Sequence, residues 1–307
     1  MAIANKQAIC NVLMELAQND KDIMVLCSDS RGSGSMTPFA EKYPEQFMEM
    51  GIAEQSLVST AAGLASCGKK PVAVSPASFL STRSMEQIKV DCAYSRQNVL
   101  LLGISGGVSY GALGMTHHSA SDIAGIASIP GMRVYIPSDS RQSAALVRAL
   151  MQDREPAYVR VGRNTVDDVY DDDSLAFELN RAMQLQDGDD LAIIACGELV
   201  SAAKEAGERL KAKGVRAAVI DMYCVKPIDR LAVQKAAKTG RIITVEEHVA
   251  IGGMGSMVAQ IAAADGNCRV MNLTLPDEPV ITGKSKEVFA YYGLDADGIV
   301  KAAESML

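Results

Sequence analysis

A carboxylate at the start of an apolar segment is the first group in this chain that could do chemistry. Residues 51 to 55 read GIAEQ, so Glu54 follows a glycine turn and opens a run whose apolar residues recur at helical spacing. A carboxylate in the first helical turn complements the helix dipole by about 0.3–1 kcal/mol, which by itself would explain Glu54. The functional interpretation is a carboxylate at a domain edge that hydrogen-bonds a ligand nitrogen.

A glycine-rich segment with two histidines is the second candidate. Residues 103–114 contain five glycines in twelve positions and lead directly into His117 and His118. Glycine lets backbone approach a ligand closely, and the segment follows a predicted strand, where ligands sit in parallel α/β sheets. Nothing nearby has the spacing of metal ligands. We therefore expect hydrogen bonding or proton transfer here rather than metal binding, and we predict no metal ligand in this chain.

Several further segments could contact anions, with weaker signals. Arg160 and Arg163 follow a predicted strand, and a guanidinium pair suits a phosphate or carboxylate. Residues 28–37 nearly spell a dinucleotide fingerprint, but Thr37 stands where the third glycine belongs. The glycines of 252–255 resemble a phosphate cradle, although tight helix packing or a subunit contact is the favoured interpretation. Residues 246–248 (EEH) could be a polar rim or an interface.

Along the chain, short apolar runs alternate with segments of helical periodicity, and these segments must position the candidate groups. Nearly continuous apolar runs are typical of strands covered on both faces, and strand–helix alternation indicates α/β folds with mainly parallel sheets. Strands are predicted at Ile23–Cys27, Pro71–Ser75, Val99–Ile104, Val134–Ile136, Ala157–Val159, Leu191–Ala195, Arg216–Ile220, Arg241–Val245 and Arg269–Leu273. Helices are predicted at Glu54–Cys67, Thr82–Tyr94, Arg141–Met151, Leu199–Lys213, Arg230–Lys238 and Met254–Ala264.

The alternation is interrupted once, which divides the chain into two α/β domains. Residues 164–175 carry five aspartates in twelve positions, a composition that cannot build a core. We therefore predict a first domain over 1–163, an acidic linker over 164–188 and a second domain over 189–307, each built on a parallel sheet.

Composition excludes several classes of function. The chain has 307 residues, with 30 Lys and Arg against 37 Asp and Glu, so its net charge of −7 disfavours nucleic acid and anionic membranes. Tryptophan is absent, and no apolar run reaches the roughly 20 residues of a membrane span. The seven cysteines are scattered and odd in number, which indicates neither a disulfide framework nor a metal site. We expect a protein of the reducing cytoplasm.

Five segments, in this order and spacing, resemble the transketolase family. They read GIAEQ at 51–55, FLSTRSMEQI at 79–88, GALGMTHH at 111–118, IPGMRVYIPSD at 129–139 and AYVRVGR at 157–163. The resemblance covers nearly the whole chain and is to the carboxyl-terminal half of the family, which is a separate subunit in split enzymes. Residues 226–229 and 245–248 resemble the small final domain.

The resemblance implies thiamine diphosphate chemistry, in which a two-carbon ketol unit passes from a ketose to an aldehyde. In this family one domain binds the diphosphate through Mg²⁺ and typically contains a GDG sequence, and another domain holds the aminopyrimidine ring. No GDG occurs here. The resemblance thus implies a pyrimidine-binding domain plus the final domain, with a separate N-terminal transketolase-type subunit as partner and self-dimerisation giving a heterotetramer.

The resemblance also assigns roles to cofactor-facing residues. Glu54 matches the glutamate that hydrogen-bonds the pyrimidine N1′ and favours the imino form of the 4′-amino group, which then removes the thiazolium C2 proton. Phe79 matches the aromatic that stacks on the ring, and a core phenylalanine is the alternative. Asp29 stands where the family has an acid at the cofactor cleft, and Ile52 lies in the same GIAEQ segment as a further cofactor contact.

The substrate-facing residues come from the same comparison. His117 matches a catalytic histidine that faces the substrate, and Arg163 matches the arginine that binds a sugar phosphate. Ser33 is a weaker candidate for a phosphate contact. Two positions depart from the family: Leu113 replaces the usual aspartate, which contacts a substrate hydroxyl, and Met85 replaces a frequent aromatic. Both put the usual pentose phosphates in doubt, because a missing polar partner changes discrimination.

Three alternatives stay open at the level of sequence. A deoxyxylulose-phosphate synthase and a 2-oxoacid dehydrogenase E1 beta subunit share the glutamate-on-helix arrangement but decarboxylate 2-oxo acids. A non-catalytic assembly partner would keep the fold alone. The donor ketose, the acceptor aldehyde and the partner chain are not specified by these residues.

Overall fold

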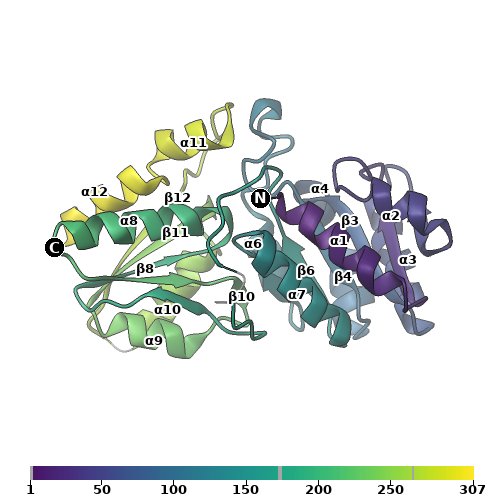
Figure 1. Cartoon of the computed structure of the whole chain (residues 1–307), viewed down its shortest axis with the longest axis horizontal. Coiled ribbons are helices and arrows are strands. Elements are labelled where there is room, and N and C mark those ends of the chain that lie inside the picture. The colour runs from purple at the N-terminus through teal and green to yellow at the C-terminus, as the bar shows by residue number, and fades with distance from the viewer. Residues whose placement is uncertain (1–2, 172–174, 265) are drawn as a thin grey trace.

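The computed structural model describes residues 3–171, 175–264 and 266–307 of the chain. They form two α/β domains, one on each side of the molecule in Figure 1, with strands from both halves of the chain in the first sheet. Within the described residues, no helix is long and apolar enough to cross a membrane. Part of the predicted acidic linker, residues 172–174, lies outside the described ranges.

The first sheet has seven strands, of which six are parallel. Each strand predicted in the first domain is present, because a strand covered on both faces needs the continuous apolar run that the sequence shows. In sheet order the strands are β10 (Cys224–Lys226), β5 (Arg133–Tyr135), β6 (Ala157–Arg160), β4 (Leu100–Ile104), β3 (Lys70–Pro76), β1 (Ile23–Cys27) and β2 (Phe47–Glu49).

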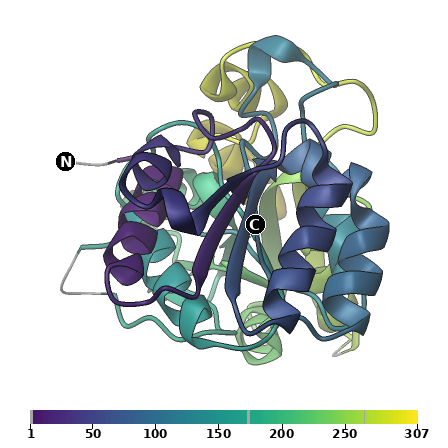
Figure 2. The same cartoon turned by 90° about the vertical axis from the view of Figure 1, so that its right-hand side faces the viewer.

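Helices cover both faces of this sheet. Val25 points to one face and packs with α1 and α7, whereas Leu26 points to the other and packs with α3 and η2. Figure 2 shows α3 and the η2 segment side by side at the end of the molecule away from the second domain. The helical segments are α1 (Asn5–Ala17), α2 (Thr37–Lys42), η1 (Pro44–Gln46), α3 (Glu54–Ser66), α4 (Ala77–Arg83), α5 (Met85–Gln87), η2 (Ile88–Tyr94), η3 (Gly111–Leu113), α6 (Asp122–Ala127) and α7 (Ser140–Gln152).

The predicted single helix over 82–94 is wrong. The helical chain starts earlier, at Ala77, breaks after Arg83, and continues as α5 and a π-helix. At the break, the Ser84 hydroxyl donates to the Leu80 carbonyl at 2.5 Å, so the side chain takes a bond that would otherwise serve the helix. As a result, α4 projects Phe79 and Arg83 from one short helix directly after β3.

The second sheet has five strands in the order β12 (Arg269–Leu275), β11 (Arg241–Val249), β8 (Leu191–Ala195), β9 (Ala217–Asp221) and β7 (Met183–Gln186). Its helical segments are η5 (Gly197–Leu199), α8 (Val200–Ala212), α9 (Arg230–Ala237), α10 (Met254–Ala264), α11 (Ser285–Tyr292) and α12 (Ala296–Met306). Helices α1, α2, α6, α11 and α12 were not predicted.

The sheets are mainly parallel, as predicted, and two strands that were not predicted pair antiparallel. β7 lies inside the predicted linker of 164–188 but pairs antiparallel with β9, and its residues Met183 and Leu185 pack on the second core. β10 follows β9 in the chain yet crosses to the first sheet and pairs antiparallel with β5. Burial of these apolar side chains against a sheet edge explains both additions, and β10 ties the two domains together.

Candidate active site

The sequence-predicted site residues gather at one edge of the first sheet. Asp29 follows β1, Phe79 follows β3 on α4, and Arg163 follows β6, while His117 ends the glycine-rich segment after β4. Glu54 opens α3, just beyond β2. Because carboxyl ends of parallel strands meet at the same edge of a sheet, segments far apart in sequence arrive together there.

Glu54 is buried and has a cationic partner that the sequence analysis missed. Its side chain is 4% exposed, and Arg83 Nη1 lies 3.0 Å from Oε1 and 3.1 Å from Oε2. The guanidinium carbon of Arg83 lies 4.0 Å from the centroid of the Phe79 ring. A planar group with N–H donors thus stacks on Phe79 while it hydrogen-bonds Glu54. Arg83 precedes the helix break by one residue, a position to which the sequence attached no signal.

The ring contacts continue from Phe79 to the glycine-rich segment. The ring centroids of Phe79 and His117 are 5.2 Å apart, and those of His117 and Tyr110 are 5.4 Å apart, both edge-on. The Arg163 guanidinium carbon lies 5.1 Å from the centroid of Tyr110. Six side chains therefore form a continuous series of contacts, here called the site row: Glu54, Arg83, Phe79, His117, Tyr110 and Arg163.

A second cation lies at the Arg163 end of the site row. Lys6, from α1, donates from Nζ to the Ser33 carbonyl at 2.7 Å. Burial lowers the pKa of Lys6, and the positive charge of Arg163 lowers it further. Two cations that repel each other favour an anion between them, so this corner suits a phosphate or sulfonate. Lys6 stands far from the predicted motifs, and only the packing of α1 reveals it.

Asp29 and Ile52 are both exposed beside Glu54, and Ile52 has 74% of its surface accessible. The Glu49 side chain joins the two segments, because its Oε1 accepts from the Asp29 amide at 2.7 Å and from the Gly51 amide at 3.2 Å. Asp29 has φ of 52°, a left-handed conformation that turns the chain away from β1. Both predicted contacts thus face outward, where another chain or a ligand can reach them.

The two neighbouring histidines lie in different environments. His117 belongs to the site row, and its Nδ1 lies 3.0 Å from the Thr116 hydroxyl. His118 is buried, and burial lowers its pKa. In the described ranges, no group of three or more His, Cys, Asp and Glu side chains is placed to hold a metal ion. Leu113, the position of the usual aspartate, is 53% exposed near this segment.

The structure corrects one sequence interpretation and decides between two others. Arg160 does not join Arg163 as an anion-binding pair: its side chain is 3% exposed and lies between Asp122 and Glu247. At the turn of 252–255 the amides of Met254 and Gly255 both donate to buried Glu246 at 2.7 Å, which excludes a phosphate cradle and agrees with the favoured interpretation of tight packing. A carboxylate of the same domain already occupies that helix start.

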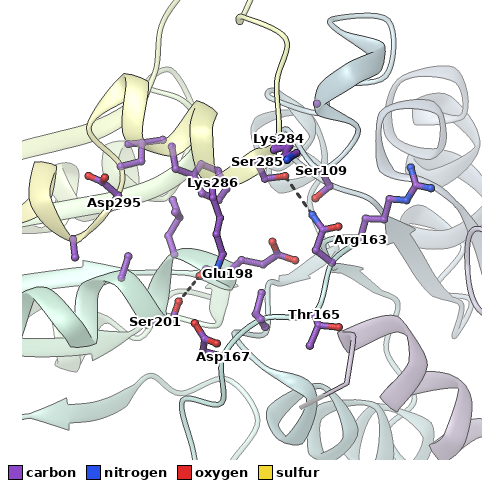
Figure 3. A pocket seen from close by; sticks show the side chains of 18 of the residues that line it. Ser109, Arg163, Thr165, Asp167, Glu198, Ser201, Lys284, Ser285, Lys286 and Asp295 are labelled. Atoms are coloured by element: carbon purple, nitrogen blue, oxygen red, sulfur yellow. Dashed lines mark hydrogen bonds between the residues drawn. The ribbon is translucent and has the colours of Figure 1, made fainter. Parts of the chain in front are cut away.

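A cavity of about 1100 Å³ lies between the domains (Figure 3). Tyr110, Leu113 and Arg163 border it from the first domain, and α8, α11 and α12 border it from the second. Figure 3 shows the Arg163 guanidinium pointing away from Glu198, so Arg163 turns its charge out of the cavity and toward the site row.

Comparison with known proteins assigns these features to a family. Residues 1–168 match the model of the transketolase pyrimidine binding domain, and residues 180–299 match that of the transketolase C-terminal domain. A solved structure described as a split gene transketolase, an inactive beta4 tetramer, superposes with a TM-score of 0.89 at 35% identity, covering 99% of this chain and 98% of that one.

Relatives of this chain carry names that point to the same family. One of the subunits of the apulose-4-phosphate transketolase of Phocaeicola vulgatus is 50% identical over 98% of this chain and 96% of its own length. A 6-deoxy-6-sulfo-D-fructose transketolase subunit of a Clostridium species is 34% identical over 96% of this chain and 92% of its own. The 1-deoxy-D-xylulose-5-phosphate synthase of Heliobacterium modesticaldum is 35% identical, but this chain spans only 46% of it. The chain therefore belongs to the transketolase family, as a transketolase subunit with a pyrimidine-binding domain followed by the C-terminal domain.

Proposed function

We propose that this chain is the pyrimidine-binding subunit of a thiamine-diphosphate-dependent transketolase that transfers a two-carbon ketol unit from a ketose to an aldehyde. The observation that carries the proposal is the site row, in which a buried carboxylate, an aromatic ring, a histidine and an arginine follow one another at the sheet edge. The family and the relatives' names support the class of reaction.

The residues present fit the aminopyrimidine. Arg83 already offers a planar N–H donor to Phe79 and Glu54, so both surfaces accept a flat ring that carries amino and ring nitrogens. A shallow pocket of about 500 Å³ opens beside them, lined by residues 52–56 and Arg83. The family model that matches residues 1–168 is that of the pyrimidine binding domain, so the proposal assigns the diphosphate and Mg²⁺ to the partner subunit.

Three residues of the site row, together with Asp29 and Ile52, have distinct tasks in this proposal. When bound, thiamine diphosphate would supply a nucleophilic thiazolium carbon for the transfer of the two-carbon unit. Glu54 would hold the pyrimidine ring through a hydrogen bond at N1′, and this contact would assist removal of the C2 proton by the adjacent amino group. Phe79 stacks on the ring, a contact of about 0.5–1.5 kcal/mol beyond burial. Asp29 and Ile52 border the ring, and His117 exchanges protons with the substrate hydroxyl groups.

The substrate would carry its negative charge at the Arg163 end. Arg163, Lys6 and Ser33 form a cationic corner at the end of the site row opposite Glu54. A ketose with a terminal phosphate or sulfonate fits this polarity, and the names of two relatives carry a phosphate and a sulfo group. Leu113 offers no hydrogen bond, so we expect a donor or acceptor without the hydroxyl that the usual aspartate would meet.

The proposal includes a heterotetramer of two such pairs in the cytoplasm, with domains near 1–163 and 189–307. The similarity to proteins named as single transketolase subunits and to a split-gene tetramer supports a partner chain. All seven cysteines are unpaired, which suits a reducing compartment.

The test is reconstitution with an N-terminal transketolase-type subunit. We expect ketol transfer from sugar phosphates only with both chains, thiamine diphosphate and Mg²⁺, and its loss in Glu54→Ala. Turnover of pyruvate instead would favour a deoxyxylulose-phosphate synthase or a 2-oxoacid dehydrogenase beta subunit; similarity to a synthase at 35% identity makes this the second candidate. No cofactor binding by the assembled pair would leave the chain as a non-catalytic assembly partner.

A further inference from the structure

The second domain binds the glycine-rich loop, which is defined here as residues 106–120. The contact is at the neck of the loop, where its two ends lie side by side. A β-bridge closes this neck: the Gly107 amide donates to the Ser119 carbonyl at 3.2 Å, and the Ser119 amide donates to the Gly107 carbonyl at 2.7 Å. His117 lies inside the closed segment, two residues from the bridge. Any movement of the neck therefore moves the histidine of the site row.

Both sides of this neck are bonded to the carboxyl end of β11. The Val108 amide donates to Glu247 Oε1 at 2.7 Å, and the Val249 amide donates to the Ala120 carbonyl at 3.0 Å. These bonds flank the bridge on its two strands. The neck of the loop is thus attached to one strand of the other domain at two points.

The tip of the loop is attached as well. The Gly283 amide donates to the Gly111 carbonyl at 3.3 Å, and a Cβ on Gly111 would lie 1.8 Å from the Gly283 carbonyl oxygen. The Ser285 hydroxyl donates to the Val108 carbonyl at 3.4 Å. Figure 1 shows the loop rising beside α11, and Figure 2 shows the same proximity. The second domain therefore contacts the loop at its neck and at its tip.

Glu247 is the centre of the neck contact. Besides Val108, it meets Arg160, whose Nη2 lies 3.1 Å from Oε2 and 2.9 Å from the Glu247 carbonyl. A Cβ on Gly107 would lie 2.0 Å from the Glu247 carboxyl carbon, and one on Gly106 would lie 2.2 Å from Arg160 Nε. The glycines of the loop are required here because the backbone packs directly on this buried ion pair.

Two opposing effects act on the pKa of Glu247. Burial raises the pKa of Glu247 to about 7, and the Arg160 charge opposes that rise. Arg160 also faces Asp122, with 3.5 Å between Nε and Oδ2, and Glu198 lies near enough that its charge and that of Glu247 repel. His248 on the same strand accepts from the Ala124 amide at 3.3 Å. A neutral side chain at 247 would lose the charge-assisted part of these bonds.

We propose that Glu247 is a positioning residue for His117, and that the second domain acts as a clamp that orders the glycine-rich loop. The role of His117 in this statement rests on the proposed function; the ordering of the loop does not. Among the described residues, no hydrogen bond or ion pair joins a side chain of the site row to the second domain. In this proposal the C-terminal domain contributes to catalysis by ordering the loop, although none of its own side chains contacts the reacting atoms.

The test compares Glu247→Gln with Glu246→Gln. Glu246 is the neighbour on β11, is equally buried, and binds only amides of its own domain within the described structure, so it is a matched control. In hydrogen exchange on the free chain, we expect amides of residues 106–120 to exchange roughly tenfold or more faster in Glu247→Gln, the factor implied by one lost hydrogen bond to a charged group. The control should leave them unchanged.

Two further readouts connect the loop to catalysis. The chain has three histidines, so an NMR spectrum of the ring Cε1–Hε1 groups resolves His117, and its signal should shift in Glu247→Gln but not in Glu246→Gln. In the reconstituted complex, kcat should fall about tenfold in Glu247→Gln with the KM for the donor unchanged, the pattern of a contact made only in the transition state.

If Glu247→Gln does not fold, Gly111→Ala opens the tip instead and should give the same faster exchange over 106–120. If hydrogen exchange over residues 106–120 and the His117 signal are the same in Glu247→Gln as in Glu246→Gln, the proposed clamp is wrong, whatever the activity of the two variants. A wild-type complex without ketol transfer overturns the proposed function instead, and the exchange comparison still decides the clamp.

Discussion

Arg83 Nη1 donates to both carboxylate oxygens of Glu54, at 3.0 and 3.1 Å, so the buried acid at the start of α3 is ion-paired. The same guanidinium stacks on Phe79, and the Arg83 side chain is 47% exposed. Arg83 therefore makes the two contacts proposed for the pyrimidine ring from a position that opens to solvent. A ring that uses the same faces must move this guanidinium aside.

This ion pair should be measurable as a coupling energy. Arg83→Met leaves the Glu54 carboxylate buried without its cation, so we expect the free energy of unfolding to fall by about 1–3 kcal/mol. In Glu54→Gln/Arg83→Met the loss should be smaller than the sum of the single changes. A double-mutant cycle by denaturant unfolding of the free chain gives this value, and additive losses would show that the contact contributes nothing.

Truncation of Phe79 should weaken cofactor binding by a limited factor. Phe79→Ala removes a stacking contact of about 0.5–1.5 kcal/mol, so the Kd for thiamine diphosphate should rise roughly twofold to tenfold beyond the effect of Phe79→Leu, which keeps most of the apolar volume. Isothermal titration of the assembled complex with the cofactor checks this. Equal Kd values for Phe79→Ala and Phe79→Leu would show that ring stacking does not contribute to cofactor binding.

Charge removal at the cationic corner should affect charged substrates alone. Arg163→Gln and Lys6→Gln should each raise the KM for a phosphorylated donor roughly tenfold, the loss of one hydrogen bond to a charged group. An unphosphorylated donor should show no comparable change. Arg154→Gln, an exposed site before β6 at the opposite edge of the sheet, is the control. A KM that rises equally for both donors would place the phosphate elsewhere.

Asp221 should make stability fall as pH rises. Burial raises its pKa to about 7, although Tyr170, Ser138 and Gln142 all donate to Oδ2. A folded pKa above the unfolded value means that stability is fully present below about pH 4 and is lost as pH rises through 7. Asp221→Asn should flatten this decline between pH 4 and 8 in chemical denaturation. Parallel curves for the two proteins would contradict the assignment.

Leu113 offers a test of specificity. Leu113→Asp restores the carboxylate that the family commonly has at this position, and 53% exposure makes the change tolerable for the fold. We expect kcat/KM for pentose phosphates to rise at least tenfold relative to Leu113→Asn, because a hydrogen bond to a charged group adds about 1.5–3 kcal/mol. Steady-state kinetics of the reconstituted variants measures the ratio, and no preference between the two would exclude this position from substrate contact.

Most strands of this protein follow from its sequence alone, whereas β2, β7 and β10, which lie at sheet edges, were not predicted. A strand buried on both faces must be apolar along its length, so runs such as Ile23–Cys27 identify themselves without tertiary information. Phe79, Arg163 and the loop that carries His117 each come after a predicted strand, and parallel strands end at one edge, so their meeting also follows. Glu54 comes after β2, which was not predicted.

Contacts between distant segments were decided only by the tertiary structure. Arg83 reaches Glu54 because Ser84 breaks the predicted helix, and Lys6 reaches the Arg163 corner because α1 packs across the sheet. Arg160 looked like a ligand-binding arginine, yet β11 of the other domain places Glu247 against it. Local sequence determines which residues form a strand, but the neighbours of that strand depend on burial of surfaces contributed by the whole chain.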